Sequence, residues 1–197
     1  RDWFNATAYA VRERLIERWM DTMRSYYRSD AKRVYYLSME FLMGRSLGSN
    51  LQALGILDLS HHALEELGID VEEVREAEPD AGLGNGGLGR LDSCFLDSLA
   101  TLDMPGFGYG INYEHGLFRQ AIEGGHQREY ADSWRATGSP WLIIRRDDAL
   151  RIHVYGQIEK VADGDGLKST RWTHPRVLVG LPHDLPIVSY GGHTVNS

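Results

Sequence analysis

The chain has 197 residues, of which 42% are hydrophobic and 25% are charged, a balance typical of one globular domain or of part of a larger one. Its formal net charge of −7 argues against a nucleic-acid partner and against an anionic membrane surface, because both require clustered positive charge. No apolar run reaches membrane-spanning length, and the one cysteine, Cys94, excludes an internal disulfide and suits a reducing compartment. We therefore expect a cytoplasmic protein that binds neither nucleic acid nor membranes.

The first predicted element is a long amphipathic helix over residues 2–29. Val11, Leu15 and Trp19 recur at four-residue steps, which predicts one face packed on a core. The chain starts inside this pattern without methionine, and it ends at residues 195–197 with no predicted helix or strand to close it. Both ends look cut, so we expect a fragment of a longer protein.

A short strand and a carboxylate follow the helix. Residues 32–39 are rich in aromatic side chains, and Tyr35-Tyr36-Leu37 suggests a strand buried on both faces. Glu40 comes next, at the carboxyl end of the strand, where open α/β sheets bind ligands. Two interpretations of Glu40 stay open, a ligand-binding carboxylate and a charge at a helix N-terminus.

Three helices are predicted between this strand and a glycine-rich segment. They cover residues 41–54, 60–67 and 70–78, with Gly55 and Gly68 ending the first two and Asp70 beginning the third. The order helix, strand, helix indicates an α/β architecture.

The glycine-rich segment runs from Ala81 to Arg90 and reads Ala-Gly-Leu-Gly-Asn-Gly-Gly-Leu-Gly-Arg. Glycine at this density persists where the backbone needs positive φ angles or must approach another group closely. An apolar stripe at three- and four-residue steps predicts a helix after it, made by Leu91, Cys94, Phe95, Leu99 and Leu102. A glycine loop at a helix start presents free N–H groups and the positive end of the helix dipole, so the segment predicts an anion site, with phosphate as the usual ligand.

Two nucleotide-binding motifs are also rich in glycine. Gly82-x-Gly84-x-x-Gly87 and Gly84-x-Gly86-x-x-Gly89 match the dinucleotide fingerprint, but the glutamate-rich residues 71–80 before them do not form a buried strand. A P-loop is excluded, because no Lys followed by Ser or Thr comes after the last glycine. A purely structural loop stays open. Asp92 and Asp97, in the helix that follows, are interpreted as solvated or capping.

The second half of the sequence reads mainly as antiparallel strands. They are predicted at residues 108–113, 117–122, 141–146, 150–158, 176–181 and 185–190, with turns at 124–125, 147–148 and 163–166. This pattern predicts an antiparallel β extension attached to the α/β part. No His-Glu-x-x-His or Cys-x-x-Cys spacing occurs, so we expect no metal site.

Several motifs resemble those of the α-glucan phosphorylases, the family of the glycogen, starch and maltodextrin phosphorylases. They are Tyr35–Arg45 (YYLSMEFLMGR), Glu78–Leu91 (EPDAGLGNGGLGRL), Cys94–Ser98 (CFLDS), Gly108–Glu114 (GYGINYE) and Ala131–Trp134 (ADSW). The resemblance runs over the whole chain, and the shared order and spacing make it far more specific than a glycine fingerprint.

The resemblance implies that residues 1–197 are part of the N-terminal, Rossmann-like domain of a two-domain glycosyltransferase fold. It implies phosphorolysis, in which inorganic phosphate cleaves the terminal bond of an α-1,4-glucan and releases α-glucose 1-phosphate. The family holds pyridoxal phosphate as a Schiff base on a lysine of the C-terminal half, and its phosphate group takes part in proton transfer. The resemblance further implies a homodimer when the protein is intact.

Site residues follow from the same resemblance. Gly86, Gly87 and Leu88 would lie against the glucosyl and phosphate groups, supported by Asn85, Arg90 and Glu40. No catalytic residue falls in this part of the chain, because the cofactor lysine and most phosphate-binding basic residues belong to the other half. We therefore expect the chain alone to be inactive.

One departure from the family pattern bears on regulation. Animal members bind AMP partly through the first helix, with a Trp and a Tyr that Trp19 and Tyr27 match. Met23-Arg24 stand where that pattern has two glutamines. The departure argues against an AMP switch and favours an unregulated bacterial-type enzyme.

Two alternatives stay open, a second kind of enzyme and a binding module. A nucleotide-sugar glucan synthase also carries a Gly-Gly-Leu-Gly loop, but it usually precedes the loop with Lys-Thr, where this chain has Asn85. A stand-alone glucan-binding or regulatory module would use stacking aromatics, for which Tyr109, Tyr113, Trp134 and Trp141 are the candidates.

Overall fold

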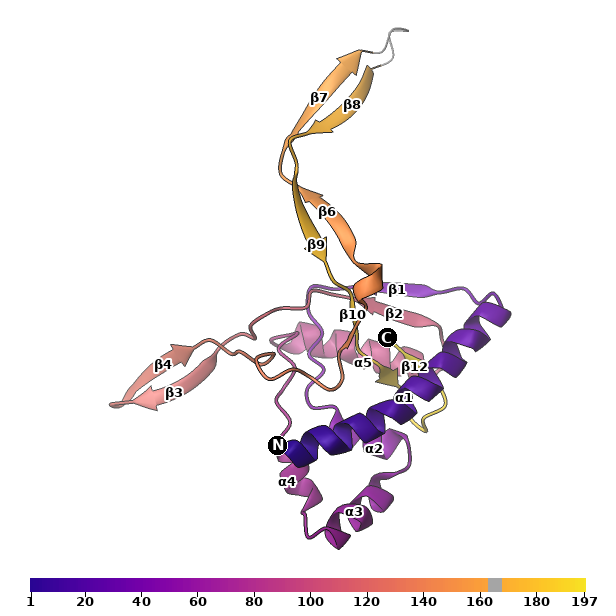
Figure 1. The fold of residues 1–197 in the computed structure, drawn as a ribbon, viewed down its shortest axis with the longest axis vertical. Helices are drawn as coiled ribbons and strands as arrows, with labels where there is room; N and C mark the ends of the chain where they lie inside the picture. Colours follow the sequence, from indigo (N-terminus) through magenta and orange to yellow (C-terminus); the bar gives the residue numbers. More distant parts are fainter. Residues whose placement is uncertain (163–167) are drawn as a thin grey trace. The chain divides into compact units, whose positions relative to one another are not determined.

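A computed structural model describes residues 1–162 and 168–197, which fall into a first unit, residues 1–142 with 185–197, and a second unit, residues 143–184. The helices of the first unit are α1 (Asp2–Arg28), α2 (Leu47–Ala53), α3 (Leu57–Glu66), α4 (Val71–Glu76) and α5 (Gly87–Thr101) (Figure 1). Its strands are β1 (Val34–Leu37), β2 (Gly106–Tyr109), β3 (Arg119–Glu123), β4 (His126–Tyr130), β11 (Ile187–Val188) and β12 (Val195–Asn196). Helices and strands are mixed, as the sequence predicted.

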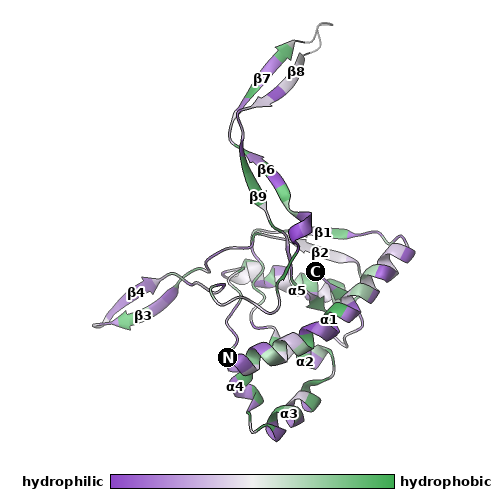
Figure 2. Cartoon of the chain, viewed as in Figure 1, coloured by the Kyte–Doolittle hydropathy of each residue, from purple (hydrophilic) through white to green (hydrophobic). Residues whose placement is uncertain are grey.

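The long helix α1 forms one side of the main core. Its buried residues Phe4, Ala8, Val11 and Leu15 recur at three- and four-residue steps, as an amphipathic helix requires. Figure 2 shows the resulting mixture of hydrophobic and hydrophilic residues along α1. The buried residues of α1 pack against residues of the next three helices, so α2, α3 and α4 share this core. Their partners are Leu47, Leu51, Leu64, Val71, Val74, Trp141 and Val195. The predicted helix over residues 2–29 is confirmed.

A buried carboxylate fixes the start of α2. The predicted helix over 41–54 is wrong in its first turn and a half, since α2 begins only at Leu47. Gly44 has a φ of 74°, a left-handed conformation in which an α-helix cannot continue. The Glu78 carboxylate accepts hydrogen bonds from the N–H groups of Ser46 and Leu47, at 2.7 and 2.9 Å, and so supplies the cap that this helix start needs.

Strands β1 and β2 pair in parallel, with Val34 opposite Gly106 and Leu37 opposite Tyr109. Helix α5 covers one face of this pair, and the glycines of β2 allow its close approach. A Cβ at Gly108 would lie 2.8 Å from the Leu96 side chain. This pairing brings Glu40, three residues after the end of β1, to the same edge as the end of β2.

Two expectations about burial are wrong. Tyr35 and Leu37 of β1 are 57% and 75% exposed, because only the face covered by α5 is buried. On α5 the buried face carries Asp92, Leu96 and Ala100 rather than the predicted apolar stripe, of which Leu91, Phe95 and Leu102 are exposed. The helix has apolar residues on two faces, and the glycine contacts with β2 decide which one turns inward.

The last residues close the first unit. Val195 and Asn196 form β12, which pairs with β11, so the expectation that no strand ends the chain is wrong. The Val195 N–H donates to Thr22 Oγ1 at 3.1 Å, and the Tyr26 hydroxyl donates to Asn196 Oδ1 at 2.9 Å. A two-residue strand is too short to show alternation in sequence, so these contacts could not be predicted.

The second unit is an antiparallel ribbon, as predicted. It contains β5 (Ile143–Ile144), the 3-10 turn η1 (Arg146–Asp148), β6 (Leu150–Val154), β7 (Gln157–Ala162), β8 (Lys168–Thr173), β9 (Arg176–Gly180) and β10 (His183–Asp184). Strand β6 pairs with β9, β7 with β8, and β5 with β10. The single strand predicted over 150–158 breaks at Tyr155 and Gly156, where φ is 61° and 84°.

Smaller differences concern strand lengths. The strands predicted at 141–146 and 185–190 shrink to β5 and β11, and the strand at 108–113 begins earlier, as β2. The predicted turn at 163–166 lies outside the described residues. In the part of the chain that the structure describes, no helix is both long and apolar enough to cross a membrane.

Candidate anion-binding site

The glycine-rich loop is held along its length by the segment that follows β1. The Phe41 N–H donates to the Leu83 carbonyl at 2.8 Å, and the Leu42 N–H donates to the Gly89 carbonyl at 2.9 Å. A Cβ at Gly84 would lie 2.6 Å from the Leu42 backbone nitrogen. Glycine is therefore required at this position by packing alone, and the structural interpretation of the loop holds for Gly84.

Gly86, Gly87 and Leu88 lie in a different environment at the start of α5. Gly86 is the N-cap residue, and the Arg90 N–H makes the first intrahelical bond, to the Gly86 carbonyl at 3.0 Å. The N–H groups of Gly87 and Leu88 thus have no acceptor inside the helix. A Cβ at Gly86 or Gly87 would meet no atom within 4 Å. Packing does not require these two glycines, and the exposed helix start has the geometry of an anion site.

Glu40 holds the loop just before this helix start. Its Oε1 accepts from the Asn85 side-chain amide at 2.9 Å, and its Oε2 accepts from the Asn85 N–H at 3.3 Å. Glu40 does not cap α2, the next helix along the chain, which begins at Leu47. Glu40 lies beside the first turn of α5 instead, where a Cβ added to Gly89 would be 3.0 Å from the Cβ of Glu40. Sequence spacing could not predict this contact between residues 40 and 85.

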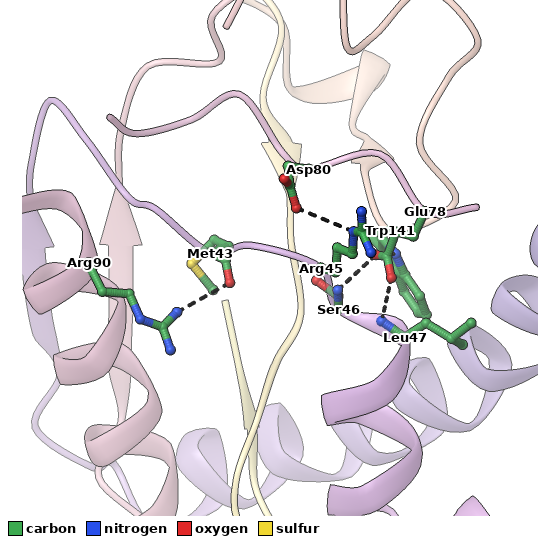
Figure 3. A network of polar contacts seen from close by, with 8 residues as sticks. All are labelled: Met43, Arg45, Ser46, Leu47, Glu78, Asp80, Arg90 and Trp141. Atoms are coloured by element: carbon green, nitrogen blue, oxygen red, sulfur yellow. Dashed lines mark hydrogen bonds and ion pairs between the residues drawn. The ribbon is translucent and has the colours of Figure 1, made fainter. Parts of the chain in front are cut away.

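Arg90 points back toward the same segment. Its guanidinium Nη1 donates to the carbonyls of Leu42 and Met43, at 3.3 and 3.4 Å; the contact with Met43 is drawn in Figure 3. Together, Glu40 and Arg90 attach the two ends of residues 40–43 to the loop and to α5. The structure thus brings the predicted residues Glu40, Asn85 and Arg90 together around Gly86–Leu88.

Asp92 was missed as a member of this cluster, and its predicted solvation is wrong. Its side chain is 6% exposed and accepts hydrogen bonds from the Tyr36 hydroxyl and, at 2.5 Å, from Ser38 Oγ. The hydrogen bonds from Ser38 and Tyr36 lower the pKa of the Asp92 carboxyl. The bond to this carboxylate raises the pKa of the Tyr36 phenol. One signal in the sequence could have predicted the burial of Asp92. This residue comes three residues after Gly89 and four before Leu96, which places it on the same face of α5 as both.

A family model described as carbohydrate phosphorylase matches residues 64–197. The chain belongs to the carbohydrate phosphorylase family. It is 47% identical to the brain form of glycogen phosphorylase from Homo sapiens, 48% to the liver form from Bos taurus and 45% to the muscle form from Ovis aries. Each match covers the whole of this chain, which spans only 23% of the length of these curated relatives.

Two of the four aromatic residues considered for sugar stacking are buried in this chain. Trp134 and Trp141 are buried, and their indole N–H groups donate to the Tyr113 carbonyl at 3.1 Å and to Glu78 Oε1 at 2.7 Å. Figure 3 shows the Trp141 indole beside Glu78. These two tryptophans cannot offer a stacking surface, so that part of the module hypothesis is wrong. Tyr109 remains exposed on β2.

Trp19 and Tyr27, the pair expected from the resemblance to contact a nucleotide, both lie on α1. They lie eight residues apart on α1, which corresponds to about 12 Å along the helix axis. Trp19 packs against the main core. Tyr27 is 71% exposed, with the Arg33 guanidinium 4.7 Å above its ring.

The first unit has one lysine, Lys32, which precedes β1 and so lies at the end of that strand opposite Glu40. Among residues 1–162 and 168–197, no group of three or more His, Cys, Asp or Glu side chains is placed to hold a metal ion.

Proposed function

We propose that this chain is part of the N-terminal domain of an α-glucan phosphorylase and supplies the loop that binds the transferred glucosyl and phosphate groups. The observation that carries the proposal is the open helix start at Gly86–Leu88, held in place by Asn85 and Glu40. Membership of the carbohydrate phosphorylase family supports it.

The chemistry explains why such a loop is useful. In phosphorolysis the bond from the terminal glucosyl C1 to the glucan oxygen breaks, a phosphate oxygen bonds to C1, and the glucan oxygen gains a proton. The substrate phosphate is an anion throughout, and negative charge shifts between its oxygens and the leaving group. The fixed N–H groups of Gly87 and Leu88 would stabilise this charge without reorganising. These two N–H groups would bind and orient the phosphate, and they would not transfer the proton.

Pyridoxal phosphate, the cofactor expected for the family, supplies a phosphate group for proton transfer when it is bound. A Schiff base requires a lysine, and Lys32 of the first unit lies at the wrong end of β1 for a site at the loop. The residues of the first unit therefore do not fit the aldehyde end of this cofactor. We infer that the lysine belongs to the remainder of the protein.

The same proposal covers the whole enzyme. Its substrates would be an α-1,4-glucan and inorganic phosphate, its product α-glucose 1-phosphate, and its form a cytoplasmic homodimer. The parallel pair β1–β2 with α5 against it would be part of a Rossmann-like domain. Because the chain spans 23% of its relatives, half of the cleft would be missing and the chain alone should have no turnover.

The proposal is tested on the intact protein from the reading frame that contains this chain. The intact enzyme should release α-glucose 1-phosphate from a maltooligosaccharide and phosphate. Gly87→Ala should lower kcat/KM for phosphate on the order of 100-fold, since displacing a bound group by about 1 Å can cost that much. A new Cβ at residue 87 meets no atom, so the thermal midpoint should not fall.

The outcomes are distinct. An intact, folded wild-type protein that forms no α-glucose 1-phosphate would refute the proposed function. Full activity of Gly87→Ala would refute the role of the loop and leave the family's reaction in place.

A further inference from the structure

A closed ring of contacts connects the buried Asp92 to the anion-binding loop. Asp92 accepts from Ser38 Oγ at 2.5 Å, and Ser38 Oγ in turn accepts from the Glu40 N–H at 3.2 Å. Glu40 holds Asn85 through both of its carboxylate oxygens. Asn85 leads into Gly86 and α5, the helix that carries Asp92.

We propose that Asp92 and Ser38 are positioning residues for phosphate binding, acting through Glu40 on the loop at Gly86–Leu88. This inference rests on the proposed function. Neither side chain touches the loop itself. Their effect is to fix the backbone at residue 40, and with it the direction of the Glu40 carboxylate that holds Asn85.

Three features favour a positioning role over simple packing. The Asp92 carboxylate is buried on α5 and accepts from both Tyr36 of β1 and Ser38, so the ring connects this helix to the segment that follows β1. Its lowered pKa keeps it charged and accepting at neutral pH. The Ser38 hydroxyl donates its one proton to the Asp92 carboxylate at 2.5 Å, which is nearer than the Glu40 carbonyl at 3.0 Å, and the hydroxyl oxygen accepts from the Glu40 N–H.

The structure offers a matched pair of variants. Ser38→Ala removes the bond to Asp92 and the bond to the Glu40 N–H. Tyr36→Phe removes the other hydrogen bond to Asp92 and leaves the connection through Ser38 intact. Both delete one hydroxyl that donates to the same carboxylate, so a merely structural role for Asp92 predicts similar losses of activity from both.

The experiment measures phosphorolysis by the intact enzyme. Ser38→Ala should raise KM for phosphate at least tenfold, while Tyr36→Phe should change it less than threefold at a comparable thermal midpoint. Hydrogen exchange gives a readout independent of activity. The Asn85 amide, which donates to Glu40, should exchange at least tenfold faster in Ser38→Ala than in wild type, with the interior of α5 unchanged.

Each outcome decides one question. Equal losses of phosphate affinity in the two variants, or an Asn85 amide unaffected by Ser38→Ala, would overturn the positioning role. Absence of phosphorolysis in the wild-type enzyme would refute the proposed function alone, because the exchange experiment still tests whether Ser38 orders the loop.

Discussion

Replacing Glu78 by glutamine tests the buried carboxylate that joins α2, α4 and the core. Glu78 is 4% exposed, and its Oε1 accepts from the Ser46 N–H and the Trp141 indole N–H, both at 2.7 Å. Its Oε2 accepts from the Leu47 N–H at 2.9 Å. All three partners are donors, so a carboxylate satisfies them and an amide cannot.

The magnitude follows from these contacts. Glutamine with its oxygen at the Oε1 position keeps two hydrogen bonds and turns its NH₂ group toward the Leu47 N–H. A buried donor without an acceptor costs about 1–3 kcal/mol. Loss of a negative charge at the start of α2 adds about 0.3–1 kcal/mol. We expect Glu78→Gln to lower the free energy of unfolding by about 1–4 kcal/mol.

Urea unfolding of the chain, followed by tryptophan fluorescence, measures this loss. Glu76→Gln is the matched control, since it makes the same chemical change at an exposed position two residues earlier and should stay within about 0.5 kcal/mol of wild type. A double-mutant cycle with Trp141→Phe should show a coupling of about 1 kcal/mol. If Glu78→Gln were as stable as Glu76→Gln, the assigned role of the carboxylate would be wrong.

Three further predictions concern stability. Gly84→Ala should cost about 1–3 kcal/mol in chemical unfolding, because its Cβ meets the Leu42 backbone, whereas Gly86→Ala should not; equal stabilities would contradict this. Burial, with a smaller effect of Asp103, raises the pKa of Tyr26 to about 12, so its contribution to stability is intact below pH ~10 and is lost as pH rises through about 12. The unfolding free energy of Tyr26→Phe should therefore fall less steeply over that range. The lowered pKa of Asp92 gives the opposite sign: its contribution is present above pH ~3.9 and is lost as pH falls through the lower folded value, so acid unfolding of Asp92→Asn should be less pH-dependent.

Regular spacing made parts of the fold predictable. The four-residue steps of α1 appear directly as its buried face, and Gly68, with a φ of 73°, ends α3 as expected. The helix start proposed to bind an anion was also predicted from sequence, since glycines followed by a helical pattern predict a helix start with free N–H groups. The structure has that helix start at Gly86.

Contacts between distant residues were not predictable. Nothing in the spacing of Glu40 and Asn85, or of Glu78 and Trp141, indicates that they meet, because such pairs depend on how separate elements pack. The prediction of which face of α5 is buried was wrong for a related reason. Its apolar residues suit two faces, and the choice between them depends on Gly106 and Gly108 of β2, which admit Leu99 and Leu96.

The strand β12 has a consequence for synthesis on the ribosome. Its bonds join Val195 to Thr22 and Asn196 to Tyr26, so α1 cannot complete its packing until the last residues have emerged. The second unit, residues 143–184, is made in between. At about 5–20 residues per second, the early helices wait roughly 10–30 seconds with this side of α1 uncovered. Chaperones that bind nascent chains would have that interval in which to protect α1, and it closes once β12 is in place.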